Sequence, residues 1–189
     1  MIAAILKENT QGETRVAATP KTVKELIDNG LQLRVQSGSG DSSFHSDQEY
    51  QDIGAEITPD TSSTLKDADI VLKVSPLTID EVDLLNEGCI YISLLQTTKE
   101  IDLIKKLSEK KVTGFSMDLI PRTTLAQSMD ALSSQANIAG YKSVIVGATH
   151  LAVYMPLLMT AAGTLSLIHI SEPTRRYAIA DAGVGLKKK

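Results

Sequence analysis

Short apolar runs alternate with amphipathic segments over most of the chain. Five runs have the length and composition of strands: Ile2–Leu6, Leu31–Val35, Ile70–Val74, Ile90–Leu95 and Val112–Phe115. Apolar residues recur at helical spacing between several of these runs, near Val23–Ile27, Ile79–Leu85 and Ile101–Leu107. Alternation of strands and helices at this spacing predicts an α/β fold, with an open, mostly parallel sheet covered by helices on both faces.

The first of these helices has recognisable ends. Pro20 opens it at its first turn, where proline is tolerated, and Thr19 is a plausible cap. Asn29-Gly30 is expected to end it in the left-handed conformation that glycine adopts readily. The glycine-rich run Ser37–Ser43 follows the second strand and favours a tight turn over a phosphate cradle, because position 43 is serine and not a third glycine.

A longer helix is predicted from about Met129 to Val153. Its first turns have a polar face and a separate apolar stripe, because both sets recur at helical spacing. The polar face consists of Asp130, Ser133, Ser134 and Asn137, and the stripe of Met129, Leu132, Ala136 and Ala139.

The most hydrophobic stretch, Val144–Met159, belongs to the end of this helix. It is shorter than the roughly 20 residues of a membrane-spanning helix and contains His150 and Pro156. A buried helix is therefore expected, with His150 as a core histidine and a break or kink at Pro156.

Composition narrows the classes of function. The net charge of -4 and the absence of a long basic stripe argue against a dominant role in nucleic-acid binding. A single cysteine, Cys89, excludes an internal disulfide framework, fits a reducing compartment and is expected to be a small core residue. The histidines His45, His150 and His169 lack metal-ligand spacing, so no metal site is predicted.

A polar loop precedes the long helix. Arg122, Gln127 and Asp130 place a guanidinium, an amide and a carboxylate within nine residues. This combination is typical of a hydrogen-bonding site for a polar small molecule. The alternative is a local role, in which Asp130 or Ser128 caps the helix.

The same loop carries a resemblance to a known family. The run Ala126–Asp130, followed by Leu132–Gln135, Asn137 and Ala139–Tyr141, resembles the nicotinamide-contacting loop and following helix of proton-translocating NAD(P) transhydrogenase, alpha subunit. The resemblance covers about residues 1–164 and implies an N-terminal domain of the alanine dehydrogenase/transhydrogenase type. That domain has a Rossmann-like or flavodoxin-like sheet and ends in a long interdomain helix.

The resemblance implies positioning roles for the loop, because hydride transfer between two nicotinamides needs no protein acid, base or nucleophile. Gln127 should hydrogen-bond the nicotinamide end of NAD(H), Arg122 and Asp130 should form an ion-paired bracket, and Ser133 should add a hydroxyl contact. Many family members have a second arginine where this chain has Leu125, which puts an electrostatic contact from that position in doubt.

The resemblance also implies partners and a location. NADP(H) would bind another component of the intact enzyme, which couples hydride transfer to proton translocation. The family works as a dimer with further membrane and NADP-binding components, on the cytoplasmic side and peripheral to the inner membrane. This segment itself is not expected to enter the membrane.

An alanine dehydrogenase-like amino-acid dehydrogenase is the alternative enzyme, because Lys7–Pro20 resembles both. In those enzymes the residues matching Arg15 and Lys73 bind the amino or keto acid, and a histidine is the acid/base. Gln96 stands at the position of that histidine and cannot shuttle a proton at neutral pH, which argues against this activity. Arg15 and Lys73 could instead form structural ion pairs with Glu8 or Glu13.

The C-terminal residues differ in character from the rest. Leu165–Arg175 resembles the translation of a transposase adapter used in sequencing libraries, so residues 1–164 are expected to be the domain and 165–189 a non-native tail. The family continues with a Gly-x-Gly-x-x-Gly turn, and Gly183-Val-Gly185 is read as incidental. A third hypothesis is therefore a non-catalytic fragment, inactive alone and prone to aggregate through Val144–Met159.

Overall fold

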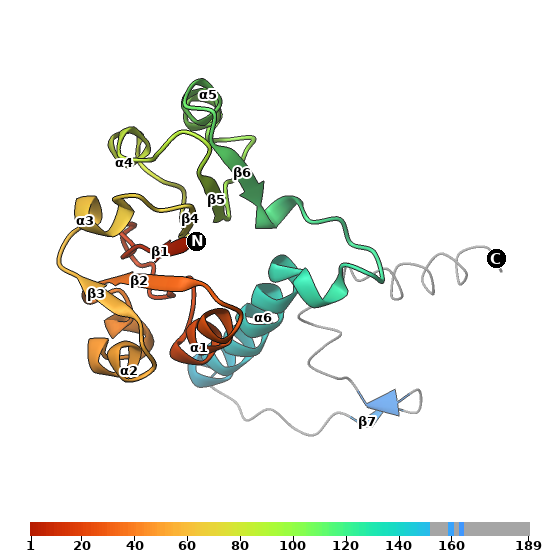
Figure 1. Ribbon diagram of the computed structural model, residues 1–189. Coiled ribbons are helices and arrows are strands. Elements are labelled where there is room, and N and C mark those ends of the chain that lie inside the picture. The colour runs from red at the N-terminus through yellow and green to blue at the C-terminus, as the bar shows by residue number, and fades with distance from the viewer. Residues whose placement is uncertain (152–158, 161–162, 165–189) are drawn as a thin grey trace. The chain divides into compact units, whose positions relative to one another are not determined.

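The computed structural model describes residues 1–151, 159–160 and 163–164 (Figure 1). The chain divides into two compact units, Met1–Ile120 and Pro121–Lys189, and each is described by itself. Three expectations concern residues outside the described ranges: the break at Pro156, the non-native tail at 165–189, and the incidental reading of Gly183-Val-Gly185.

The first unit is built on a six-stranded sheet with the order β3-β2-β1-β4-β5-β6. Every neighbouring pair of strands is parallel, which confirms the predicted fold class. Its strands are β1 (Ile2–Ile5), β2 (Gln32–Gln36), β3 (Glu56–Thr58), β4 (Ile70–Leu72), β5 (Ile90–Ser93) and β6 (Thr113–Ser116).

The strand order reverses at β1, which pairs with β2 on one side and β4 on the other. Ile5 is in register with Val35 of β2 and with Leu72 of β4. The residues that follow β1 and β4 therefore emerge side by side at the carboxyl edge of the sheet. In open parallel sheets this reversal point is where ligands usually bind.

Helices cover both faces of the sheet, and each face has its own apolar core. Helices α1 (Pro20–Asp28) and α2 (Asp47–Asp52) pack on one face through Val23 and Tyr50, which are fully buried. On the other face lie α3 (Thr61–Leu65), α4 (Ile79–Asp83) and α5 (Ile101–Glu109), and their core residues are Leu65, Val82, Leu85, Leu103 and Leu107. Figure 1 shows α4 and α5 together beyond one edge and α1 and α2 together near the other.

Local chemistry fixes the helix ends. Proline occupies the start of α1, and Gly30 follows that helix with a φ of 90°, as predicted. Thr19 stands at the cap position but its side chain makes no capping hydrogen bond. Helices α2 and α4 each begin with a capping box, in which Ser46 with Glu49 and Thr78 with Glu81 exchange hydrogen bonds.

Three elements between residues 47 and 65 were not predicted from the apolar pattern. They are α2, β3 and α3, which contain only six, three and five residues. Such short segments complete less than two turns or a few pleats, so they carry too few apolar positions to show a period. Short 3-10 turns lie at Asp41–Ser43 and Met117–Leu119.

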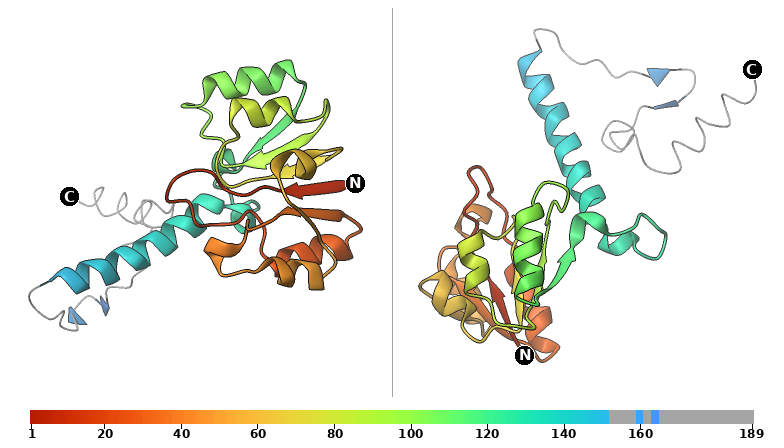
Figure 2. Two further views of the ribbon diagram at one scale, coloured as in Figure 1. Left: turned by 90° about the vertical axis from the view of Figure 1, so that its left-hand side faces the viewer. Right: turned by 90° about the horizontal axis from the view of Figure 1, so that it is seen from above.

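The second unit contains the predicted long helix, α6 (Ala131–His150), shown in two views in Figure 2. A 3-10 turn, Gln127–Met129, precedes it, and a two-stranded ladder joins β7 (Met159–Thr160) to β8 (Gly163–Thr164).

The expectation of a buried helix is wrong for the described part of Val144–Met159. No residue of α6 is buried, and Ile145 and Val146 are each more than two-fifths exposed. His150 is an exposed residue at the helix end and not a core histidine. Exposure of this apolar surface is what the fragment hypothesis predicts. Among the described residues, no helix has the length and apolar character needed to cross a membrane.

Candidate functional site

Two groups of polar residues are candidates for a functional site, one in each unit. The first lies at the reversal point of the sheet, where the chain leaves β1 and β4. The loop after β1 contains Lys7, Glu8 and Asn9, and the loop after β4 begins with Lys73. Because both strands are parallel, the two loops meet at the carboxyl edge.

Lys73 forms a buried ion pair in this group. Its ammonium donates to both carboxylate oxygens of Glu81, at 2.9 and 2.7 Å, and the two side chains are 1% and 9% exposed. Glu81 also accepts from the side-chain amide of Asn9 at 3.0 Å and from the backbone N–H of Thr78 at 2.8 Å. The charge of Lys73 is thus neutralised by a carboxylate that is itself held from two other directions.

Glu8 makes a second internal contact across the same edge. One carboxylate oxygen accepts from the backbone N–H of Val74 at 2.6 Å, and the other accepts from that of Ser75 at 3.0 Å. Two successive N–H groups directed at one carboxylate form a small concave anion site. In this structure an internal side chain occupies that site.

Arg15 pairs with Glu13, as the structural alternative predicted. The guanidinium donates twice to Glu13, at 2.7 and 2.6 Å. This hydrogen bonding holds the pKa of Glu13 below its ordinary value and raises the pKa of Arg15. Lys73 also forms a structural pair, although its partner is Glu81 and neither Glu8 nor Glu13.

Gln96 follows β5 and is exposed at the same edge. Its φ of 47° lies in the left-handed region, and its carbonyl accepts from the N–H groups of Lys99 and Glu100. Ser93, at the end of β5, is the nearest hydroxyl along the chain and is buried. Neither an amide nor an ordinary hydroxyl can replace the histidine that an amino-acid dehydrogenase would use as acid/base.

The glycine-rich run after β2 is a turn, as predicted, and its N–H groups are used internally. Ser37 N donates to Thr58 O at 2.8 Å, and Ser39 N donates to Gln36 O at 3.1 Å. The carboxylate of Asp47 accepts from Gly38 N at 2.9 Å and from the Ser37 hydroxyl at 2.6 Å. The donors that a phosphate would need are therefore already satisfied.

The second group is the polar loop of the second unit, ahead of α6. Arg122 and Gln127 are exposed, and Gln127 begins the 3-10 turn that leads to the helix. Leu125 is 93% exposed, so the position where many family members have arginine points an apolar side chain into solvent. The loop thus presents an exposed guanidinium and an exposed amide in a form that a ligand could reach.

Asp130 caps α6, which is the local role that the sequence left open. Its carboxylate accepts from the backbone N–H of Ser133 at 2.9 Å and from the Ser133 hydroxyl at 2.6 Å. These hydrogen bonds, with a smaller contribution from the charge of Arg122, lower the pKa of Asp130. The expected ion-paired bracket is present only as this longer-range attraction, because no direct ion pair joins Arg122 and Asp130 in the described loop.

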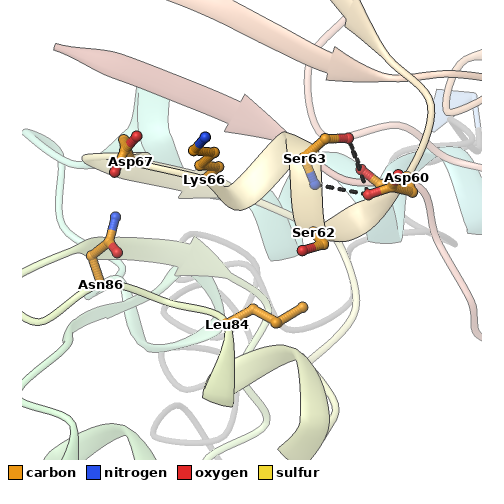
Figure 3. A pocket seen from close by; sticks show the side chains of 7 residues that line it. All are labelled: Asp60, Ser62, Ser63, Lys66, Asp67, Leu84 and Asn86. Atoms are coloured by element: carbon orange, nitrogen blue, oxygen red, sulfur yellow. Dashed lines mark hydrogen bonds between the residues drawn. The ribbon is translucent and has the colours of Figure 1, made fainter.

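A pocket of about 450 Å³ lies elsewhere on the first unit (Figure 3). It is open to solvent and is lined by Asp60, Ser62, Ser63, Lys66, Asp67, Leu84 and Asn86. Figure 3 shows that its carboxylate from Asp60 turns toward Ser63, where it caps α3. The described residues contain no cluster of side chains that could hold a metal ion.

Fold and edge chemistry together define a doubly wound parallel α/β domain, the architecture of many nucleotide-dependent oxidoreductases. The model of the family described as alanine dehydrogenase/PNT, N-terminal domain, matches residues 4–139. The chain belongs to this family.

Relatives narrow the comparison. The first of the separate pieces of NAD(P) transhydrogenase subunit alpha in Rhodospirillum rubrum is 41% identical over an alignment that covers 97% of this chain and 47% of the relative. Alanine dehydrogenase of Methanococcus maripaludis is 31% identical, and the alignment covers 80% of the chain and 40% of that enzyme. The crystal structure of transhydrogenase from Sinorhizobium meliloti matches with a TM-score of 0.79 at 38% identity, over 87% of this chain and 49% of that one. The chain spans about half the length of these relatives.

Sequence reasoning found Lys73 and Arg15 but missed what holds Lys73. Glu81 lies eight residues beyond Lys73, on α4, and reaches back only because the loop between them turns through Pro76. The one usable signal was the capping box, Thr78 with Glu81, which places a carboxylate at the start of α4. Glu8 gave no signal, because its partners are backbone N–H groups that carry no residue identity.

Proposed function

We propose that this chain is the N-terminal portion of the NAD(H)-binding component of an NAD(P) transhydrogenase, and that residues 1–164 form its N-terminal domain. The observation that carries the proposal is the loop before α6, where exposed Arg122 and Gln127 stand next to the capped pair Asp130–Ser133. The Rhodospirillum rubrum relative supports it, because that protein is a piece of a transhydrogenase alpha subunit. The solved transhydrogenase structure supports the same assignment.

The loop chemistry suits a nicotinamide nucleotide. An amide such as Gln127 can both donate to and accept from a carboxamide, and Arg122 offers planar donors to phosphate or hydroxyl oxygens. Asp130 retains acceptor capacity beyond its two bonds to Ser133, since each carboxylate oxygen has two lone pairs. A bound nicotinamide nucleotide supplies the hydride itself.

The protein residues would then act by position alone. Gln127 would hold the nicotinamide end, Arg122 the polar groups of the cofactor, and Ser133 would contribute its hydroxyl beside Asp130. The cap on α6 fixes Asp130 and Ser133 relative to the helix axis, so the polar face starts from a defined point. Holding a ring in a reactive orientation is a large part of catalysis when the reaction needs no protein acid or base.

In the intact enzyme we place this component with other chains. NADP(H) would bind a separate component, and hydride transfer would be coupled to proton translocation by membrane parts. We propose a homodimeric arrangement, peripheral to the inner membrane on its cytoplasmic side. These features rest on the transhydrogenase assignment and on no contact within this chain.

The test is NADH affinity in the intact protein with Arg122→Ala or Gln127→Ala. Losing one charge-assisted or neutral hydrogen bond to the cofactor should weaken NADH binding by about tenfold or more, as measured by isothermal titration calorimetry. The matched control is Gln51→Ala, which removes an exposed amide on α2 and should leave the affinity unchanged. Unchanged NADH affinity in both loop variants would refute the proposed site.

The 189-residue chain by itself should bind NADH weakly. It spans about half of its relatives, and a dinucleotide cleft needs a second wall that holds the pyrophosphate. Titration of the chain with NADH should give no saturation in the micromolar range. Micromolar affinity would show that these residues form a complete site.

An amino-acid dehydrogenase is the second candidate, supported by the relative from Methanococcus maripaludis. Two observations weigh against it: Gln96 cannot act as acid/base, and Lys73 is neutralised by Glu81. Alanine-dependent reduction of NAD⁺ by the intact protein would favour this candidate over the transhydrogenase.

A further inference from the structure

Internal carboxylates occupy three sets of donors at the carboxyl edge of the sheet. Glu8 accepts from Val74 N and Ser75 N after β4. Asp47 accepts from Gly38 N after β2. Glu81 accepts from the ammonium of Lys73 through both of its carboxylate oxygens. These are the kinds of group that bind a phosphate in other doubly wound sheets, and here each has an acceptor from the chain itself.

We propose that the pair of N–H groups at Val74 and Ser75 is a self-occupied anion site, in which Glu8 takes the place of an external phosphate or carboxylate. By filling it, Glu8 closes the reversal point of this sheet to the phosphates of a dinucleotide. The inference goes beyond the proposed function and does not depend on it, because it concerns the first unit alone and none of the loop residues Arg122, Gln127 or Asp130.

The geometry of Glu8 fits an anion site closely. Each oxygen meets a different N–H of one successive pair, at 2.6 and 3.0 Å, so the carboxylate is held at both ends. The next groups along the chain are also fixed, since the Tyr91 hydroxyl accepts from Leu77 N at 3.0 Å and donates to Ser75 O at 3.3 Å. The site is therefore rigid and keeps its shape if the Glu8 side chain is removed.

The charge at this edge repels a further anion. Glu8 lies close enough to Arg15 to raise the pKa of that guanidinium, and Arg15 is already paired with Glu13. With Lys73 and Glu81, the group holds three carboxylates and two cations, a net charge of minus one. A phosphate would have to displace Glu8 and then lie beside the displaced carboxylate.

A purely structural brace is the competing interpretation. Under it, Glu8 connects the two loops, and its removal leaves donors that take up water and show no preference for anions. Under our proposal, the emptied site binds acetate or inorganic phosphate, because the N–H pair stays in place and the net charge of the group rises from minus one to zero.

The experiment uses Glu8→Ala in the 189-residue chain, titrated with acetate and with inorganic phosphate at constant ionic strength. The readouts are the amide resonances of Val74 and Ser75 and the unfolding temperature. The control Glu25→Ala removes an exposed carboxylate of α1 with the same change in charge and size. Acetamide serves as a neutral ligand of the same shape as acetate.

The Glu8→Ala protein should bind acetate about tenfold more tightly than the unsubstituted chain or Glu25→Ala, since hydrogen bonds to a charged group are worth more than those to water. Acetate should raise its unfolding temperature, and acetamide should not. If Glu8→Ala is unfolded in chloride buffer, acetate should restore the native circular dichroism spectrum.

Two results would overturn the proposal. One is an equal response of Glu8→Ala to acetate and acetamide at Val74 and Ser75. The other is saturable phosphate binding at these amides in the unsubstituted chain, which would mean that Glu8 does not close the site. Neither result bears on NADH binding at Arg122 and Gln127, so the two proposals fail separately.

Discussion

At the scale of single residues, the strongest contacts of this domain join charged groups to partners on other elements. The Lys73–Glu81 pair is almost completely buried and connects the end of β4 to α4. A buried pair is not by itself a large source of stability, because removing both ions from water costs about as much as their attraction returns. Removing one partner is different, since the other is then left charged and poorly solvated.

We therefore expect Lys73→Met to lower the free energy of unfolding by about 3–5 kcal/mol, because it leaves Glu81 buried without its cation. The double variant Lys73→Met/Glu81→Gln should lose less than the sum of the two single changes. Urea unfolding followed by circular dichroism measures both.

The control for this prediction is Lys105→Met, which breaks an exposed pair with Asp102. The side chains of that pair are 68% and 92% exposed, so its loss should change the free energy of unfolding by less than about 1 kcal/mol. Equal losses for Lys73→Met and Lys105→Met would contradict the role of burial.

Asp130 gives a prediction that depends on pH. Its pKa is lowered in the folded chain by the hydrogen bonds from Ser133, so the carboxylate cap stabilises α6 above the ordinary value of 3.8. That contribution is lost as the pH falls through the lowered pKa. Asp130→Ala should cost about 1 kcal/mol at neutral pH, whereas Asp130→Asn should keep most of the cap.

Far-UV circular dichroism of the three proteins between neutral and acidic pH tests this prediction. The helical signal of the unsubstituted chain should fall at the acid end, and the Asp130→Asn protein should lack that component of the fall. An identical acid response in both would mean that another group controls it.

Residue chemistry was only partly predictable from the sequence. Arg122, Gln127, Asp130 and Ser133 were chosen as cofactor residues, and their role remains a proposal, while the capping role of Asp130 was one of two stated alternatives and is present. The pairing of Arg15 with Glu13 was foreseen because the two are neighbours in sequence. Glu8 escaped prediction because backbone donors at Val74 and Ser75 become visible only when the loop is folded.

At the scale of elements, periodicity predicted those long enough to repeat. The five predicted strands and the helices α1, α4, α5 and α6 all occur, with ends displaced by a few residues. The elements missed, α2, β3 and α3, are held mainly by caps and by long-range packing such as that of Tyr50, whose hydroxyl donates to Ala18 O at 2.9 Å. That contact joins residues 32 apart in sequence, which no local window can detect.

Helix α6 offers a test of element stability without tertiary packing. Gly147 lies in its interior, and no atom lies within 4 Å of the position that a side-chain carbon would take there. Gly147→Ala should therefore stabilise the helix by about 0.5–1 kcal/mol, because alanine loses less backbone freedom on folding. Thermal melting of the helical circular dichroism signal measures the gain.

The same change at another glycine is the matched control. A side-chain carbon at Gly40 would come within 2.5 Å of the His45 carbonyl oxygen, so Gly40→Ala should destabilise the first unit. A gain in stability from Gly40→Ala, or a loss from Gly147→Ala, would contradict the packing described for these two positions.

At the scale of the whole molecule, the chain is one half of a larger architecture. The alignment with the Rhodospirillum rubrum protein covers 97% of this chain and so includes residues after Thr164. The boundary at Thr164 and the non-native tail remain predictions, and resequencing of the parent gene across Thr164 and Leu165 tests them. A continuation into a strand and a Gly-x-Gly-x-x-Gly turn would support both.

The last prediction concerns self-association of the chain through α6. Ile138, Tyr141 and Ile145 recur at helical spacing and are 61%, 56% and 43% exposed. An apolar surface of this kind, left uncovered because the remaining half of the relatives has no counterpart here, favours contact between copies. Sedimentation velocity should show association that increases with concentration.

Charge on that face should abolish the effect. Ile138→Lys/Ile145→Lys should keep the chain monomeric over the same concentrations, because burial of two ammonium groups would cost more than the contact returns. The control Lys24→Glu changes an exposed charge on α1 and should leave association unchanged. A monomeric unsubstituted chain at every concentration would show that the exposed apolar face of α6 does not drive association, and the inactive-fragment hypothesis would then rest on the missing half of the cofactor cleft alone.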